Sequence, residues 1–145
     1  MKVKIKKLHA DAVVPSYGTV GAAGFDFYAL EDTHLLPGET KLIKTGIAME
    51  IPLGYEVQVR PRSGMSLKTW FRVANAPGTI DADYRGECCV IGQNTGSTFD
   101  RTITIKKGDR IAQGVLALAP QAEFEVVEEL GDTNRGTNGF GHTGV

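Results

Sequence analysis

The feature that most constrains this chain is a series of short runs in which apolar and polar residues alternate, with glycine and proline between the runs. Val3 and Ile5 alternate with lysines, and residues 55–59 and 102–105 show the same two-residue period. This period is typical of strands that bury one face. The turn signals between the runs are Pro37-Gly38, Pro52-Leu53-Gly54, Pro77-Gly78 and Lys107-Gly108-Asp109. Because no long amphipathic helix lies among them, the pattern favours an all-β fold over parallel βαβ units.

The expected architecture is a jelly-roll-like distorted β-barrel or sandwich. We expect one short helical turn at residues 64–69 and a last strand at residues 124–127. With 145 residues, the chain has the length of one domain and can bury a core without a disulfide or structural metal. We therefore expect a β domain at residues 1–130 and a flexible C-terminal arm at residues 131–145.

Charge and cysteine usage exclude several classes of protein. The 16 basic and 17 acidic residues give a net charge of −1, whereas a protein that binds duplex DNA needs a net basic face. No apolar stretch approaches the roughly 18 residues of a membrane span, and no secretory signal is expected at the basic start. Adjacent Cys88 and Cys89 would point to opposite faces of a strand, which predicts free thiols in a reducing compartment. His9, His34 and His142 lack a zinc-type spacing.

The segment at residues 131–145 stands apart in composition. It contains five glycines and few side chains that could join a core, so by itself it should be mobile. One interpretation is a frayed tail. The other is a ligand clamp, because glycine permits close backbone approach, Arg135 offers a fork for phosphate and Phe140 offers a stacking face, with Thr143 beside them.

Four further islands contain residues that could carry chemistry: 23–29 with Asp26, 61–66 with Arg62, 78–87 with Asp81, and 108–113 with Gln113. Each has a purely structural alternative. These are, in order, an aspartate on the exposed face of a strand, a helix start with a solvated arginine, a polar hairpin arm, and a turn that leads into a strand.

Two of these islands contain groups that could bind a ligand. At residues 61–66, backbone N–H groups, the Ser63 hydroxyl and Arg62 would form an anion site where the short helix begins. At residues 78–87, Asp81 and Asp83 would share one face of an extended stretch, where they could shift each other's pKa or serve a metal. Tyr84 beside them offers a flat apolar surface.

Taken together and in order, the five islands resemble the five motifs of the trimeric deoxyuridine triphosphatase (dUTPase) family and span residues 23–144. The resemblance implies a β jelly roll that assembles as a homotrimer with shared active sites. It also implies hydrolysis of dUTP to dUMP and pyrophosphate with Mg²⁺, which keeps uracil out of DNA and supplies dUMP for thymidylate synthesis. The implied location is the cytoplasm, or the host cytoplasm for a viral protein.

The resemblance also implies roles for five residues of the β domain. Asp81 resembles the residue that activates the attacking water, and Tyr84 the ring beneath the deoxyribose. Asn75 matches the hairpin asparagine that helps to read uracil. Gln113 resembles a phosphate contact, and Asp26 the acid that positions the water shell of the metal. No direct protein ligand for Mg²⁺ is expected, because this ion often binds through substrate phosphates and waters.

Further roles fall on the second and fifth motifs. Arg62, Ser63 and Gly64 resemble the phosphate-binding second motif. In the arm, Arg135 resembles the γ-phosphate arginine and Phe140 the ring that stacks on uracil when the arm closes over the site. The remaining expected substrate contacts of the arm are Gly141, His142 and Thr143.

Two other functions remain open at this stage. A dCTP deaminase of the same fold, or a bifunctional enzyme, would need an arginine-serine-serine stretch, but Gly64 follows Arg62-Ser63 here. A regulatory binding protein could use the same scaffold, although Asp81 and Tyr84 are both retained.

Overall fold

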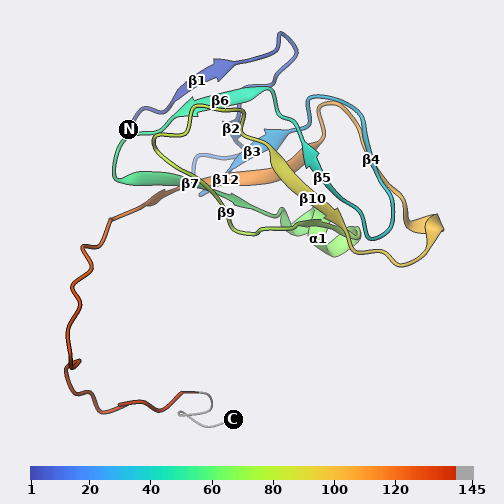
Figure 1. The fold of residues 1–145 in the computed structure, drawn as a ribbon. Helices are drawn as coiled ribbons and strands as arrows, with labels where there is room; N and C mark the ends of the chain where they lie inside the picture. The colour runs from blue at the N-terminus through green and yellow to red at the C-terminus, as the bar shows by residue number, and fades with distance from the viewer. Residues whose placement is uncertain (140–145) are drawn as a thin grey trace.

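The computed structural model describes residues 1–139, which form a β-rich body and a long C-terminal extension (Figure 1). The strands are β1 Lys4–Lys7, β2 Ser16–Tyr17, β3 Phe25–Tyr28, β4 Thr33–Leu35, β5 Thr40–Ile43, β6 Ile47–Glu50, β7 Tyr55–Arg60, β8 Phe71–Val73, β9 Gly78–Ile80, β10 Val90–Asn94, β11 Ile103–Ile105 and β12 Arg110–Leu118. The α-helix in the described part of the chain is α1, Ser63–Lys68, and a 3₁₀ turn spans Phe99–Arg101. The prediction of an all-β fold with one short helix is confirmed.

The strands form antiparallel sheets that enclose one apolar core. The largest sheet has the order β2-β3-β12-β7-β9, and a three-stranded sheet has the order β5-β10-β8. Two pairs, β1-β6 and β11-β4, complete the body. The largest apolar side chains that are almost wholly excluded from solvent are Phe27, Phe71, Leu35, Ile43, Ile47, Ile105, Ile111, Val57 and Val90. These residues come from strands in every sheet, so the sheets share a single core.

The two-residue period places functional side chains on the outer face of the five-stranded sheet. In β3, Phe25 and Phe27 are buried while Asp26 and Tyr28 alternate with them and stay half-buried. In the central strand β12, Gln113 lies opposite Asp26 in the register with β3. The alternation read from the sequence therefore determines that Asp26 and Gln113 face the same side of the sheet.

The C-terminal extension begins earlier than the sequence predicts. The last strand ends at Leu118, and Ala119 donates a backbone hydrogen bond to Gly54 (2.9 Å) before the chain leaves the body. Residues 124–127 were predicted as a strand, but they are in no strand, and Phe124 and Val126 are 93% and 100% exposed. The prediction is wrong for the isolated chain, because a strand needs a partner for its backbone groups and none lies beside this segment within residues 1–139. We call residues 120–145 the arm, of which the structure describes residues 120–139.

Candidate functional site

The first group of predicted site residues surrounds Asp26. Arg62 Nε lies 3.0 Å from one carboxylate oxygen of Asp26, and Arg110 Nη1 lies 3.3 Å from the other. The Asp26 side chain is only 16% exposed, so both pairs are partly shielded from water. The sequence did not single out Arg110, although it stands inside the island at residues 108–113. Its position at the start of the same strand as Gln113 was the available signal.

Hydrogen bonds join this group to the segment before α1. Gln113 Nε2 donates to the Pro61 carbonyl (3.0 Å), and Arg62 Nη1 donates to the Arg110 carbonyl (3.1 Å). Gly24 has no room for a side chain, because a Cβ there would lie 2.8 Å from Gln113 Oε1. Predicted residues from three islands, together with Arg110, thus meet at one place, which we call the Asp26 cluster: Asp26, Arg62, Arg110 and Gln113.

Helix α1 starts directly beside the Asp26 cluster. Arg62 is its N-cap residue, and no side chain caps the first turn. Ser63 and Gly64 are exposed there, and their backbone N–H groups have no partner within the helix. The predicted helix start with available donors is therefore present, next to two arginines.

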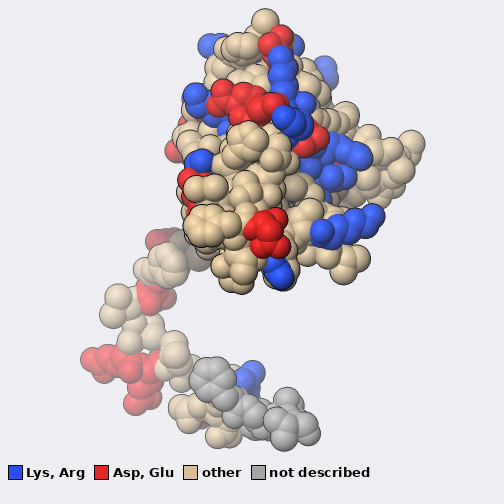
Figure 2. Space-filling model, turned by 90° about the vertical axis from the view of Figure 1, so that its right-hand side faces the viewer, with Lys and Arg blue, Asp and Glu red and all other residues tan. Residues whose placement is uncertain are grey.

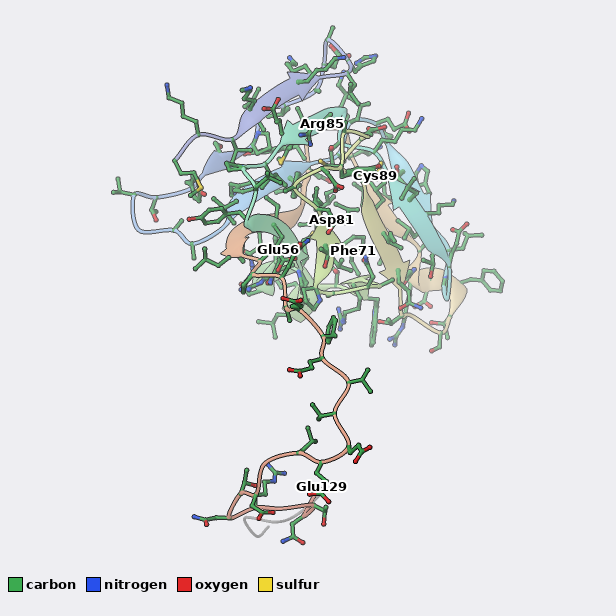
Figure 3. All side chains as sticks on the ribbon, turned by 60° about the vertical axis from the view of Figure 1, so that its left-hand side comes forward. Glu56, Phe71, Asp81, Arg85, Cys89 and Glu129 are labelled. Atoms are coloured by element: carbon green, nitrogen blue, oxygen red, sulfur yellow. The ribbon has the colours of Figure 1, made fainter. Side chains whose placement is uncertain are left out.

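The second group, predicted as a hairpin, lies on the turn between β8 and β9 and on the segment after β9; the two strands belong to different sheets. Asn75, Asp81 and Tyr84 line one pocket of about 360 Å³, whose wall also includes Cys89. Asn75 packs against Gly78, where an added Cβ would lie 3.0 Å from the Asn75 amide nitrogen. Asp81 and Cys89 are labelled in Figure 3. We call Asn75, Gly78, Asp81 and Tyr84 the hairpin cluster.

The backbone at Asp81 differs from the prediction. Asp81 and Asp83 were expected in one extended stretch, but β9 ends at Ile80 and residues 82–83 form a turn. The Tyr84 N–H donates to the Asp81 carbonyl (3.2 Å) and closes this turn. The reversal occurs because the pairing of β9 with β7 stops at Ile80, so the two carboxylates do not share a strand face.

Tyr84 presents its ring at the surface of the pocket. Its hydroxyl donates to the Glu87 carbonyl (3.3 Å), and the ring remains 47% exposed. The phenol lies over Gly86 so closely that any Cβ at this position would overlap it. Gly86 therefore permits a tyrosine conformation in which one ring face is free for an apolar ligand surface.

The two clusters are far apart within one chain. In the five-stranded sheet, β12 and β7 lie between β3, which carries Asp26, and β9, which precedes Asp81. Three strand spacings correspond to about 14 Å, and Asp81 is displaced further along the strands. The structure thus brings Asp26, Arg62 and Gln113 together, and separately Asn75, Asp81 and Tyr84.

The arm carries the third group. Arg135 Nε donates to the Asn138 carbonyl (2.8 Å) and Nη2 to the Gly139 carbonyl (3.3 Å), within a turn that includes Gly136 at φ +55°. Figure 1 shows this turn well away from the body, and Figure 2 shows acidic side chains along the arm. Phe140, Gly141, His142 and Thr143, which were predicted to contact substrate, lie outside the described residues.

Residues 1–139 contain no group of three or more His, Cys, Asp or Glu side chains that could hold a metal by themselves. None of the helices described is long and apolar enough to cross a bilayer. Cys88 and Cys89 are free thiols, and burial raises the pKa of each to about 11. Both thiols are therefore uncharged near neutral pH.

Comparison with known proteins gives a consistent result. A family model described as dUTPase matches residues 10–144. The chain is 55% identical to the deoxyuridine 5'-triphosphate nucleotidohydrolase of Nautilia profundicola, covering 99% of both chains. It is 52% identical to the enzyme of the same name from Helicobacter hepaticus, covering 100% of this chain and 90% of the relative.

Solved structures agree in fold. The dUTPase of Staphylococcus bacteriophage 80alpha with bound dUpNHpp superposes with a TM-score of 0.93 at 30% identity, covering 99% of both chains. A mutant dUTPase from phage phi11 of S. aureus, described with a structural Mg(II) ion, has a TM-score of 0.86 at 27% identity and covers 91% of this chain and all of that one.

Proposed function

The chain belongs to the dUTPase family and hydrolyses dUTP to dUMP and pyrophosphate, and we propose that it does so as a homotrimer whose active sites are shared between neighbouring chains. The reaction removes the precursor of uracil misincorporation and yields dUMP for thymidylate synthesis. The observation that carries the shared-site proposal is the separation of the Asp26 cluster from the hairpin cluster. A nucleoside triphosphate must touch residues of both groups, which one chain holds about 14 Å apart or more.

The arm and strand β1 have complementary charge patterns, which supports pairing of the arm of one chain with β1 of another. Strand β1 pairs only with β6 among the described residues, so its other edge is free, and Lys4 and Lys6 alternate along it with Val3 and Ile5. In the arm, acidic residues alternate with apolar ones: Glu123 and Glu125 flank Phe124, and Val126 follows. Opposite charges across strands and paired apolar side chains favour antiparallel addition to a free edge. The expected strand at residues 124–127 would then form on a neighbouring chain.

At the triphosphate end, the Asp26 cluster would supply charge neutralisation. Arg62 and Arg110 are held by one carboxylate, and the free N–H groups at Ser63 and Gly64 lie beside them. A triphosphate can replace the carboxylate as the partner of these guanidinium groups, because each can bind phosphate oxygens through its planar fork. Gln113 completes the phosphate contacts, and Arg135 of an arm would reach the γ-phosphate.

The residues present fit a magnesium ion that binds with the substrate. Mg²⁺ prefers oxygen ligands and commonly binds through one or two carboxylates together with phosphates and waters. Asp26 is the carboxylate next to the phosphate-binding groups, so it would orient the water shell of the ion. When bound, Mg²⁺ would neutralise charge that develops on the phosphate oxygens.

At the nucleoside end, the hairpin cluster would read the base and sugar. Asn75 and the backbone near Gly78 would offer donors and acceptors to uracil, and the floor of this pocket would leave no room for the methyl group of thymine. The exposed face of Tyr84 would lie beneath the deoxyribose and exclude a 2′-hydroxyl. Asp81 would accept a proton from the water that attacks the α-phosphorus. Phe140, Gly141, His142 and Thr143 would close over the bound nucleotide, and the enzyme would act in the cytoplasm.

Two experiments test this proposal. Pyrophosphate release is measured across the deoxynucleoside triphosphates and UTP, with and without Mg²⁺, and we expect activity with dUTP in the presence of Mg²⁺. Release of ammonia from dCTP would instead indicate a deaminase.

The second experiment tests assembly. Light scattering should give three times the chain mass of 15.6 kDa. An inactive Asp81→Asn chain mixed with an inactive chain that lacks residues 132–145 should recover activity, since mixed trimers would contain complete sites. A fully active monomer would contradict the shared-site proposal.

A further inference from the structure

The turn that carries Asp81 and Tyr84 is fastened by a side chain to which no role has been assigned above. Arg85 Nη1 donates to the Ala82 carbonyl (2.7 Å) and to the Tyr84 carbonyl (2.9 Å). With the backbone bond from Tyr84 to Asp81, three hydrogen bonds define this four-residue turn, and Arg85 supplies two of them. One nitrogen therefore ties together the carbonyls on either side of Asp83.

The two halves of the segment between β9 and β10 are held differently. The second half is anchored to the body, because the Gly46 N–H donates to the Glu87 carboxylate (2.7 Å) and Cys88 exchanges bonds with Thr45 and Ile47. The first half has no backbone bond to another strand within the described residues and depends on its own turn and on Arg85. This first half is the one that carries Asp81.

The location of Arg85 suits this task. Its side chain lines a hollow of about 360 Å³ with Lys4, Lys6 and Glu50, on the side of the β1–β6 pair. Figure 3 shows Arg85 close to this pair, away from Asp81. Arg85 makes no ion pair within 4.0 Å in residues 1–139, so backbone carbonyls are its closest partners there. It can therefore hold the turn from behind without entering the substrate pocket, whose lining residues do not include it.

We propose that Arg85 is a positioning residue for dUTP hydrolysis, which fixes the turn so that the Asp81 carboxylate and the Tyr84 ring keep their places relative to the substrate. The inference rests on the roles proposed above for Asp81 and Tyr84. A planar guanidinium is pre-organised for two carbonyls at a fixed separation, whereas the ammonium of lysine is a single point on a flexible stem. Loss of position by about 1 Å can lower turnover by roughly 10²-fold, even when the displaced groups are chemically intact.

The test compares Arg85→Ala and Arg85→Lys with a matched control, Arg72→Ala. Arg72 Nη1 also donates to two nearby carbonyls, of Thr69 (3.0 Å) and Phe71 (2.7 Å), in β8 and not in the hairpin turn. We expect Arg85→Ala to lower kcat by about 10- to 10²-fold with a smaller change in KM, and Arg85→Lys to recover only part of the loss. Arg72→Ala should retain kcat within about twofold.

Two further readouts separate positioning from a general loss of structure. Added guanidinium, below concentrations that unfold the chain, should raise kcat of Arg85→Ala and leave kcat of Asp81→Asn unchanged. The ratio of kcat/KM for dUTP over UTP should fall in Arg85→Ala, because the Tyr84 ring shifts with the turn. An unchanged kcat in Arg85→Ala, equal losses in Arg72→Ala, or no response to guanidinium in a folded variant would overturn the proposal. A fully active Asp81→Asn would instead overturn the proposed site itself.

Discussion

The body and the arm hold their site residues in opposite ways. In the body, Asp26 is 16% exposed and is paired with two arginines that come from different segments. In the arm, the hydrogen bonds of Arg135 within residues 1–139 go to carbonyls three and four residues further along its own chain. The body places its residues through long-range packing, so their geometry exists before substrate binds. Within residues 120–139 the arm makes only local hydrogen bonds, so its position must come from a ligand or a neighbouring chain.

This difference predicts which substitutions and deletions should lower activity without lowering stability. Site residues on the surface of the body can lose their chemistry while the core remains intact. The end of the arm from residue 132 onward can be removed, because residues 132–139 contribute no buried side chain to the core. Changes inside the core should instead alter stability first.

The largest effect is expected for Asp81→Asn. Asparagine has the same shape and can still form hydrogen bonds, but it cannot accept a proton from the attacking water. We expect kcat to fall by about 10²- to 10⁴-fold while urea unfolding is unchanged, since Asp81 is exposed. Steady-state assays and urea titrations of the same preparation measure both. A variant that kept more than about a tenth of wild-type kcat would remove Asp81 from the role of base.

Deletion of residues 132–145 should also abolish most activity, with a loss of roughly 10²-fold in kcat/KM. The Arg135 fork would be lost, together with Phe140 and the exclusion of water that a closed arm provides. The thermal midpoint and the trimer mass should remain those of the full chain, because residues 132–139 contribute no side chain to the core. Retention of kcat/KM within about twofold would make the segment a frayed tail after all.

The sequence predicted well what depends on local pattern. The two-residue period correctly assigned β1, β7 and β11. The short helical turn predicted at residues 64–69 is found at Ser63–Lys68. These features were accessible because each is decided by neighbours within a few residues.

The sequence failed where distant partners decide the structure. The pairing of Arg110 with Asp26 joins residues 84 positions apart, and no local pattern encodes it. The turn after Ile80 depends on where β9 stops pairing with β7. Residues 124–127 have the alternation of a strand, but the chain itself offers no partner beside them. The alternation in the arm is therefore a property whose structural consequence lies outside a single chain.

A smaller effect is expected for Tyr84→Ala, which tests specificity. Removal of the ring would open space near the sugar 2′ carbon, so UTP should be admitted more readily. We expect the ratio of kcat/KM for dUTP over UTP to fall by about tenfold or more. Tyr17→Ala is a suitable control, because Tyr17 is an exposed tyrosine (54%) on β2. An unchanged ratio in Tyr84→Ala would place the sugar elsewhere.

The smallest effect concerns the core thiol of the body. Burial raises the pKa of Cys88 from 9.0 to about 11, so the fold favours the neutral thiol. This stabilisation is fully present below pH 9 and is lost as the pH rises towards 11, because the unfolded chain ionises first. At a pH midway between these values, the loss is on the order of 1 kcal/mol. The free energy of unfolding should therefore decline more steeply with pH in the wild type than in Cys88→Ala.

The comparison uses the slope with pH, since the cavity left by alanine lowers stability equally at each pH. The arm-deleted chain should follow the wild-type slope, because Cys88 packs in the body. Equal slopes in the wild type and Cys88→Ala would show that the buried thiol does not control alkaline stability, and a changed slope after arm deletion would show that the arm contributes to the core.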